Sequence, residues 1–226
     1  MSTYVEPRFT LENAAGRRRA YWHLYWTDHG FLRAVYPNLV WLPGGMARSN
    51  QPSPGRIRAY AAAGLRTIIN LRGPDDSGAY LLEREACLRH GVELIDFRVK
   101  SRDAPSRETV LGARDLFARI AYPALMHCKS GADRVGLMSA LYMHFRCNAP
   151  IPEAKRQLAL RYGHVRQGKT GMLDFFLESY LASPEAAKGQ SFEDWVAHAY
   201  DPAAVKAQFL SQWWANVLVD RVLRRE

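Results

Sequence analysis

Cysteine is scarce in this sequence, and its scarcity excludes several kinds of protein. The three cysteines are Cys87, Cys128 and Cys147, and none belongs to a Cys-x-x-Cys pair. No Cys/His cluster has zinc-finger spacing, so we expect free thiols, a reducing compartment and neither a metal nor another cofactor. There is also no internal repeat and no low-complexity tract. With nearly half of its 226 residues hydrophobic, the chain has the composition of an ordinary globular protein.

Long apolar runs are absent as well, so no segment is expected to cross a bilayer. Residues 1–8 lack the apolar core of a signal peptide, and the default expectation is a cytoplasmic protein. The charge is uneven, with 31 Lys and Arg residues against 22 Asp and Glu residues, a formal net charge of +9. A positive excess favours anionic partners such as phosphorylated molecules or an acidic membrane, although a solubilising surface has the same composition.

Arginine and aromatic residues concentrate near the N-terminus, in the segment RRRAYWHLYW at residues 17–26. Segments of this kind can touch a membrane surface or nucleic acid. Because the amphipathic pattern is short, we expect the segment to pack its aromatic side chains on the domain and to leave its arginines in water. Peripheral membrane contact through the basic surface is the second interpretation, and no nucleic-acid partner is expected.

Strand and helix patterns alternate up to residue 134, and only helical patterns follow. Short apolar or β-branched runs predict strands at residues 39–42, 45–48, 66–71, 92–99 and 123–127. This order predicts an α/β fold with a mainly parallel sheet of about four or five strands, flanked by helices, and an all-helical C-terminal extension. We expect an N-terminal segment, a central domain and C-terminal helices over residues 1–37, 38–184 and 185–226.

The segment with the clearest chemistry is HCKSGADR at residues 127–134. It follows an apolar strand, contains Gly131 and precedes a helix that is apolar nearly all round. A loop wrapped at a helix N-terminus directs backbone N–H groups at one point and binds an anion there. The same field stabilises the thiolate form of Cys128, and the planar fork of Arg134 matches two phosphate oxygens. A thiolate in a phosphate cradle is placed to attack phosphorus.

This octapeptide resembles the HCxxGxxR signature of the protein tyrosine phosphatase superfamily. The segments RSNQPSP at 48–54 and TIINLR at 67–72 resemble the compact dual-specificity-like branch, which includes bacterial members. The resemblance covers roughly residues 38–147. It implies a phosphomonoesterase that works through a phosphocysteine at Cys128, with the phosphate held by Arg134 and by the loop residues Lys129, Ser130, Gly131, Ala132 and Asp133.

The resemblance also implies an aspartate that protonates the leaving oxygen and then activates water. Asp103, in a polar loop after a predicted strand, is the best candidate, although it lies closer to the cysteine than is usual in the family. Asp96 has the longer spacing but falls within a predicted strand, where a pairing role is favoured. His127 is expected to support the loop rather than to transfer a proton.

Two positions depart from the family pattern. Val135 replaces the serine or threonine whose hydroxyl assists breakdown of the phosphocysteine, so the second step is expected to be slow unless another group substitutes. Asp133 beside a phosphate site needs a cation, a loop hydrogen bond or a substrate hydroxyl as its partner. Asp133 is similar to the aspartate of myotubularin-like lipid phosphatases, and Lys129 to a loop lysine of inositol-lipid phosphatases.

Several functions therefore stay open at this level. The leading hypothesis is a phosphatase of phosphotyrosine or related protein phosphates. The same chemistry on a lipid or inositol phosphate is second, and a phosphate-binding pseudophosphatase is third because of Val135. A rhodanese-like sulfurtransferase is disfavoured by the HCxxGxxR pattern.

Overall fold

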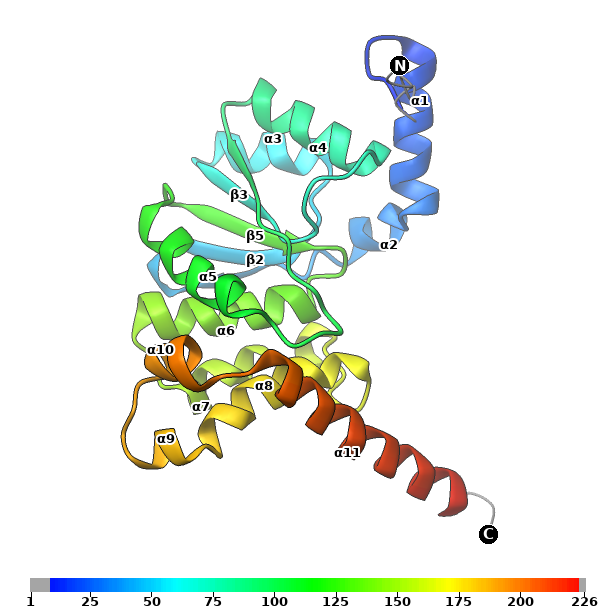
Figure 1. Ribbon diagram of the computed structural model, residues 1–226. Coiled ribbons are helices and arrows are strands. Elements are labelled where there is room, and N and C mark those ends of the chain that lie inside the picture. The colour runs from blue at the N-terminus through cyan, green and yellow to red at the C-terminus, as the bar shows by residue number, and fades with distance from the viewer. Residues whose placement is uncertain (1–8, 224–226) are drawn as a thin grey trace, which may run out of the picture. The chain divides into compact units, whose positions relative to one another are not determined.

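A five-stranded sheet forms the centre of the first half of the chain, in the order β1-β2-β5-β3-β4. The computed structural model describes residues 9–223, with side chains described up to residue 214. The strands are β1 (Val40–Leu42), β2 (Met46–Asn50), β3 (Thr67–Asn70), β4 (Glu93–Asp96) and β5 (Ala124–Cys128) (Figure 1). β1 pairs antiparallel with β2, and all other neighbours are parallel. The predicted mainly parallel α/β sheet is confirmed.

Burial explains why these runs form strands in this order. Every residue of β2, β3 and β5 is buried, whereas the edge strands β1 and β4 are only partly buried. The apolar residues of β3 and β5 suit strands that are covered on both faces, whereas β2 also buries the polar residues Arg48, Ser49 and Asn50. The predicted strand at residues 92–99 is shorter in the structure, because β4 pairs with β3 only over Glu93–Asp96.

The chain divides into two compact units, which we describe separately. Unit 1 comprises residues 1–98 and 120–131, and unit 2 comprises residues 99–119 and 132–226. The domain boundaries predicted at residues 37 and 184 remain predictions. Residues 1–8 and 224–226 of the two terminal segments lie outside the described residues.

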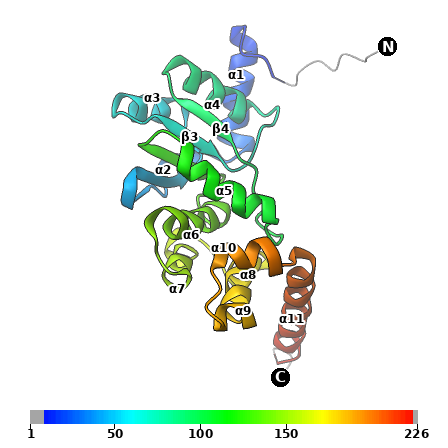
Figure 2. The same cartoon turned by 60° about the vertical axis from the view of Figure 1, so that its left-hand side comes forward.

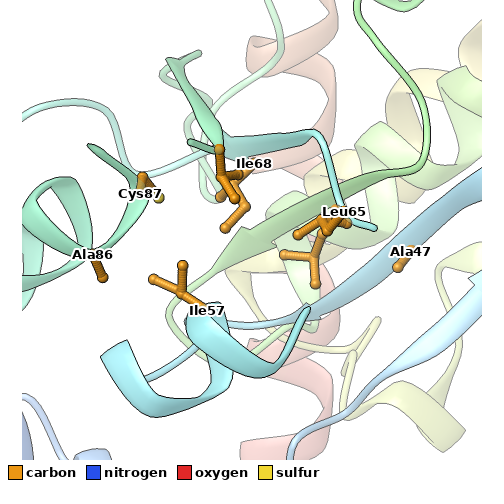
Figure 3. Close-up of a cluster of buried hydrophobic side chains, with 8 residues drawn as sticks. Ala47, Ile57, Leu65, Ile68, Ala86 and Cys87 are labelled. Carbon is orange, nitrogen blue, oxygen red and sulfur yellow. The ribbon is translucent and has the colours of Figure 1, made fainter. Parts of the chain in front are cut away.

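Unit 1 adds its helices to the sheet. They are α1 (Ala14–Trp22), a π-helical turn η1 (His23–Thr27), α2 (Gly30–Val35), α3 (Pro54–Ala62) and α4 (Gly78–Arg89), with a 3-10 turn η2 (Pro43–Gly45) between β1 and β2. Ser53 and Ser77 cap α3 and α4 by accepting hydrogen bonds from backbone N–H groups. Ile57 of α3 and Cys87 of α4 pack against Ile68 of β3 in the cluster of Figure 3.

The regular elements of unit 2 within its described residues are all helices or helical turns. Its helices are α5 (Arg107–Arg119), α6 (Asp133–Cys147), α7 (Ile151–Ala154), α8 (Met172–Leu181), α9 (Pro184–Ala187), α10 (Phe192–Asp194) and α11 (Pro202–Leu223), with short turns η3 (Lys155–Gln157), η4 (Leu160–Tyr162), η5 (Lys169–Gly171) and η6 (Trp195–Ala199) (Figure 2). Phe176, Trp195 and Tyr200 form an aromatic core. The predicted helical C-terminal region is confirmed, and no described helix is long and apolar enough to cross a bilayer.

The N-terminal segment corrects one expectation. α1 and η1 bury Ala20 and Leu24 next to Ala79 and Leu82 of α4, and of the aromatic residues in the segment Tyr21 is partly buried against this cluster. The tryptophans that we expected to pack on the domain, Trp22 and Trp26, are instead 66% and 56% exposed. Gly78 meets the backbone of Ala20, so the two helices approach closely at this point, and Trp22 and Trp26 stay outside the contact.

Candidate active site

Cys128 is the last residue of the central strand β5. It lies opposite Asn50 of β2 in the parallel register, and its side chain is buried, with 2% exposed. The carboxyl ends of parallel strands converge at one edge of a sheet, which is where α/β proteins place their ligands. The sheet thus delivers the thiol to the edge at which a binding loop begins.

The loop after Cys128 turns sharply at Gly131. This residue has φ +78°, in the left-handed region that glycine occupies readily. A Cβ atom at this position would lie 2.7 Å from the backbone nitrogen of Asn50 and 2.9 Å from Nδ2 of Asn38. Backbone conformation and space therefore both require glycine here.

Two side chains of unit 1 hold the loop by its carbonyl groups. Nη2 of Arg48 donates to the carbonyl of Gly131 over 3.1 Å, and Nδ2 of Asn38 donates to that of Ser130 over 3.3 Å. In a trans peptide group the C=O and N–H point in opposite directions. Fixing these carbonyls toward β2 therefore turns the next two N–H groups to the other side, as an anion-binding loop needs.

The chain passes from unit 1 to unit 2 between Gly131 and Ala132, and α6 begins at Asp133. The first N–H groups of a helix lack intrahelical acceptors, and the helix dipole adds positive potential there. Arg134 lies in this first turn and is half-buried. Among the residues that the structure describes, no carboxylate pairs with its guanidinium, so the fork of Arg134 is free to bind an anion.

Asp133 has a partner that the sequence did not indicate. Nδ1 of His164 lies 2.7 Å from Oδ1 of Asp133, and its Nε2 lies 2.6 Å from Oδ2 of Asp174 on α8. His164 and Asp174 are buried. Burial by itself would lower the pKa of His164, but hydrogen bonds to Asp133 and Asp174 outweigh it and raise the pKa to about 9. A histidine cation between two carboxylates thus fixes the residue before Arg134.

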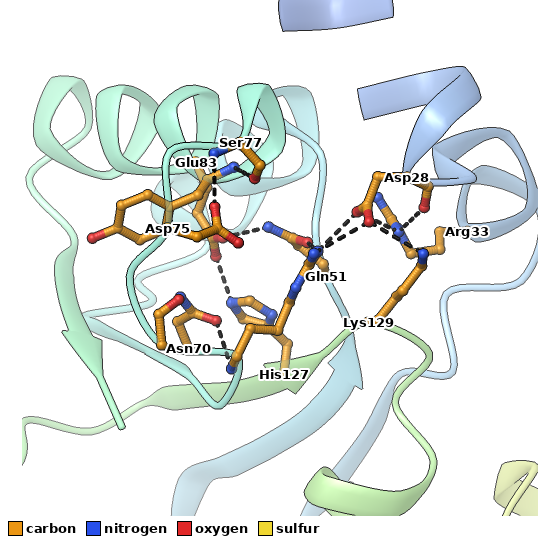
Figure 4. Close-up of polar contacts among 12 residues, drawn as sticks. Asp28, Arg33, Gln51, Asn70, Asp75, Ser77, Glu83, His127 and Lys129 are labelled. Carbon is orange, nitrogen blue, oxygen red and sulfur yellow. Dashed lines mark hydrogen bonds and ion pairs between the residues drawn. The ribbon is translucent and has the colours of Figure 1, made fainter. Parts of the chain in front are cut away.

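Lys129 belongs to a second ionic cluster, in unit 1. Its Nζ lies 3.3 Å from Oδ1 of Asp28, which also binds Arg33 at 2.9 Å and Arg72 at 2.8 Å (Figure 4). Burial alone would raise the pKa of Asp28, but the hydrogen bond from Arg72 and the charges of the three cations lower it overall. A buried carboxylate surrounded by cations therefore stays ionised and restrains Lys129.

His127, which precedes the cysteine, is fully buried against a carboxylate. Its Nε2 lies 2.5 Å from Oε1 of Glu83 on α4, and Nε2 of Gln51 donates to the other oxygen of Glu83 over 2.7 Å (Figure 4). Buried charged groups are retained where they have such partners. Through this contact with Glu83, His127 would support the end of β5 and the loop that follows it.

Asp103 lies in unit 2, before α5. Its carboxylate is 2.9 Å from Nζ of Lys206 on α11 and 3.3 Å from Nζ of Lys100. The hydrogen bond to Lys206, followed by that to Lys100, lowers the pKa of Asp103. A general acid must carry a proton before it can donate one. The two ion pairs favour the ionised carboxylate of Asp103 and therefore disfavour that role as long as they are formed. Asp96 has the structural role expected of it, since it accepts hydrogen bonds from Asn70 and Tyr80.

The other two cysteines are free thiols outside the loop, and Cys87 is buried whereas Cys147 is partly buried. Burial raises the pKa of the Cys87 thiol to about 12, and burial also raises that of Cys147. No group of three or more His, Cys, Asp or Glu residues within the described part of the chain could hold a metal ion.

Sequence reasoning missed Asp28, Glu83, His164 and Asp174. Asp28 left a signal, because it is the one acidic residue in the basic and aromatic stretch 13–36. Glu83 left a weaker one, a carboxylate on the apolar face of α4. Nothing in the spacing of His164 or Asp174 points to Asp133.

Comparison with known proteins identifies the class to which this fold and loop belong. The match shows a cysteine-dependent phosphatase of the dual-specificity type, a phosphoric monoester hydrolase. The chain belongs to the family described as "DSP-PTPase phosphatase fused to NAD+ Kinase", whose model matches residues 45–171. A search of curated proteins gave no match.

Solved structures share the fold at low sequence identity. TpbA of P. aeruginosa is 19% identical, with a TM-score of 0.52, and the match covers 63% of this chain and 84% of that one. Tk-PTP in its active form is 23% identical, with a TM-score of 0.50 over 64% of this chain and 98% of that one. A putative DUF442 phosphatase from Shewanella putrefaciens CN-32 is 17% identical, with a TM-score of 0.51 and coverages of 65% and 95%.

Proposed function

We propose that this phosphatase hydrolyses phosphotyrosine and related phosphate esters of proteins, with Cys128 as nucleophile. The observation that carries the proposal is the loop after β5. Arg48 and Asn38 hold its carbonyls back, Gly131 makes the turn, and no carboxylate of the described residues occupies Arg134. A dianionic phosphate would meet backbone N–H groups and a free guanidinium at the buried thiol.

The reaction would proceed in two steps. The Cys128 thiolate attacks phosphorus, the S–P bond forms, and the P–O bond to the alcohol breaks while Asp103 donates a proton to the leaving oxygen. Asp103 then takes a proton from water, which attacks phosphorus and releases inorganic phosphate and the thiolate. For the first step Asp103 must bind a proton, so its pairs with Lys100 and Lys206 would have to open.

The other loop residues would bind rather than react. Backbone N–H groups of Ser130, Gly131 and Ala132 would surround the phosphate oxygens, and Lys129 would add positive charge at the rim. Asp133, held by His164, would fix the start of α6, and His127 would support the strand end.

A lipid or inositol phosphate is the second candidate substrate. Lys129 favours it, because its side chain is 43% exposed directly after Cys128, where it could turn from Asp28 to a second phosphate group. Peripheral contact with a membrane would then bring the enzyme to its substrate. A cytoplasmic protein would meet either class of phosphate ester.

A generic aryl phosphate tests the nucleophile. Cys128→Ser and Arg134→Lys should each lower kcat/KM by at least about 10³-fold, because they remove covalent catalysis or the bidentate contact. Cys147→Ser, at a half-buried thiol outside the loop, is the control and should retain activity. If Cys128→Ser hydrolyses the ester as fast as the wild type does, Cys128 is not the nucleophile. Tight vanadate binding without turnover in the wild type would indicate a pseudophosphatase instead.

A substrate panel then separates the two ester classes. Phosphotyrosine peptides, phosphoserine peptides and soluble phosphoinositides are compared by kcat/KM at equal ionic strength. The proposal expects phosphotyrosine peptides to be the best substrates. A preference for phosphoinositides that Lys129→Met abolishes would favour the lipid candidate.

A further inference from the structure

The segment that joins α1 to β1 carries an exposed apolar surface. We call it the aromatic surface, and it consists of the exposed residues Trp22, Tyr25, Trp26, Phe31, Leu32, Val35 and Tyr36. Val35 is 88% exposed and Leu32 is 58% exposed. All of these residues belong to unit 1, on α1, η1 and α2 or directly after α2. An exposed apolar patch of this kind marks an interaction site.

The rings form a continuous row. The centroids of Trp22 and Trp26 lie 5.7 Å apart, and those of Trp26 and Phe31 lie 5.6 Å apart. Phe31 is part of α2, which also carries the exposed side chains of Leu32 and Val35, so the exposed apolar residues are concentrated in one segment of the chain. Tryptophan and tyrosine are the side chains that favour the interface between a bilayer and water, because an apolar ring carries one polar atom.

Within the stretch 13–36 the exposed charged side chains are all arginines. Arg18 and Arg19 of α1 are exposed, whereas the one acidic residue of stretch 13–36, Asp28, is buried and paired with cations. A cavity of about 190 Å³ opens beside Tyr25, with Arg33 and Arg56 and no carboxylate among its lining residues. Cationic side chains next to tryptophan complement the anionic head groups of phospholipids.

We propose that the aromatic surface docks unit 1 on an anionic phospholipid bilayer. The rings would enter the head-group region, and Arg18 and Arg19 would contact lipid phosphates. Insertion would be interfacial, since no described helix could cross the bilayer. This docking does not depend on which phosphate ester the enzyme cleaves.

The surface is also tied to the candidate active site. Trp26 is two residues before Asp28, which is roughly 7 Å of extended chain at most. Asp28 in turn binds Lys129, the residue after Cys128. Docking through this surface would therefore hold the phosphate-binding loop close to the lipid–water boundary.

Vesicle flotation of the full chain tests the proposal. Wild type should float with vesicles of phosphatidylcholine mixed with phosphatidylglycerol, and not with phosphatidylcholine alone. Trp22→Ala/Trp26→Ala should lower the partition constant by about tenfold or more. Trp214→Ala, at a ring 55% exposed on α11, is the matched control and should float like the wild type.

The electrostatic part needs its own pair of variants. Arg18→Ala/Arg19→Ala should lower partition roughly 30-fold, from about 1 kcal/mol per cation near an anionic membrane. Arg58→Ala/Arg119→Ala makes the same change of net charge at exposed sites on α3 and α5 and should have a smaller effect. Hydrolysis of a soluble aryl phosphate should stay unchanged in all these variants, which separates this surface from the catalytic assignment.

Three results would overturn the proposal. The first is wild type that fails to float with anionic vesicles. The second is a Trp22→Ala/Trp26→Ala variant that floats as well as the Trp214→Ala control. The third is a dimeric wild type and a monomeric Trp22→Ala/Trp26→Ala variant that partition equally onto vesicles. That result would assign the surface to contact with a second copy of the chain.

Discussion

His164 binds Asp133 across 31 residues of sequence, with 2.7 Å between Nδ1 and the carboxylate oxygen. Asp133 is the residue before Arg134, and His164 is braced from behind by Asp174. Gly163, with φ +82°, lets the chain turn beside Ala132 and places the histidine in this position. The carboxylate that a phosphate site would otherwise disfavour is thus neutralised from within unit 2.

The raised pKa of His164 predicts how stability depends on pH. Its pKa is about 9 in the folded chain, against an ordinary value of about 6.5, so the folded state binds the proton more tightly. The stabilisation is fully present below about pH 6.5 and is lost as pH rises to about 9. The free energy of unfolding in urea should therefore fall by at most about 3 kcal/mol between these values.

His164→Gln should remove most of this pH dependence and lower stability at pH 6, because two carboxylates lose their cation. His198→Gln, at an exposed histidine of unit 2, is the control. An equal fall of the unfolding free energy in wild type and His164→Gln would show that another group titrates.

Gly131 predicts a loop that tolerates no side chain. Gly131→Ala should abolish hydrolysis of an aryl phosphate, since the new Cβ would press on the backbone of Ser49 and Asn50. Gly91→Ala is the matched control, because Gly91 also has φ above zero, at +66°, but has open space around it. We expect that variant to lose about 1 kcal/mol of stability and to keep its activity. Equal activity of the two variants would contradict this account of the loop.

The pairing of Asp103 predicts a change in the pH profile. Lys206→Met removes the strongest cause of its lowered pKa, so the alkaline limb of kcat/KM should move to higher pH. The substrate should have a poor leaving group, which depends on the general acid. In an Asp103→Asn background, Lys206→Met should leave the pH profile of kcat/KM unchanged. A shift that persists in this background would assign the general acid to another residue.

Val135 predicts a slow second step. It is fully buried in the first turn of α6 and supplies no hydroxyl to assist hydrolysis of the phosphocysteine. With a good leaving group, stopped-flow measurements should show a burst close to one equivalent of alcohol. Val135→Thr should shrink this burst and raise the steady-state rate several-fold, because the added hydroxyl can donate a hydrogen bond to the departing Cys128 thiolate. Val110→Thr, at a buried valine of α5, controls for the cost of a buried hydroxyl. A wild type without a burst would show that another group replaces the hydroxyl.

The sequence alone determined the features that rest on local pattern. β3 and β5 contain short apolar runs, and serines mark the starts of α3 and α4, so these elements could be predicted from local pattern. The phosphate-binding role of Cys128 and Arg134 could be proposed from the order of strand, glycine loop and apolar helix, because such a loop is built from consecutive residues. The exposure of Trp22 and Trp26 to solvent could not be predicted, because the helical pattern of α1 does not reveal which of its residues face α4.

Only the tertiary structure decided what surrounds the loop. Arg48 reaches the carbonyl of Gly131 from a position 83 residues away in the chain, Asp28 binds Lys129, and His164 binds Asp133. These partners are single polar residues without a periodic pattern, and a polar residue in a sequence does not reveal whether folding will bury it. The role of each residue depends on which distant segments the core brings together. Hydrophobic burial drives this association without specifying which polar side chains will meet. The motif therefore identifies the chemistry, while distant polar contacts determine how each loop residue is held.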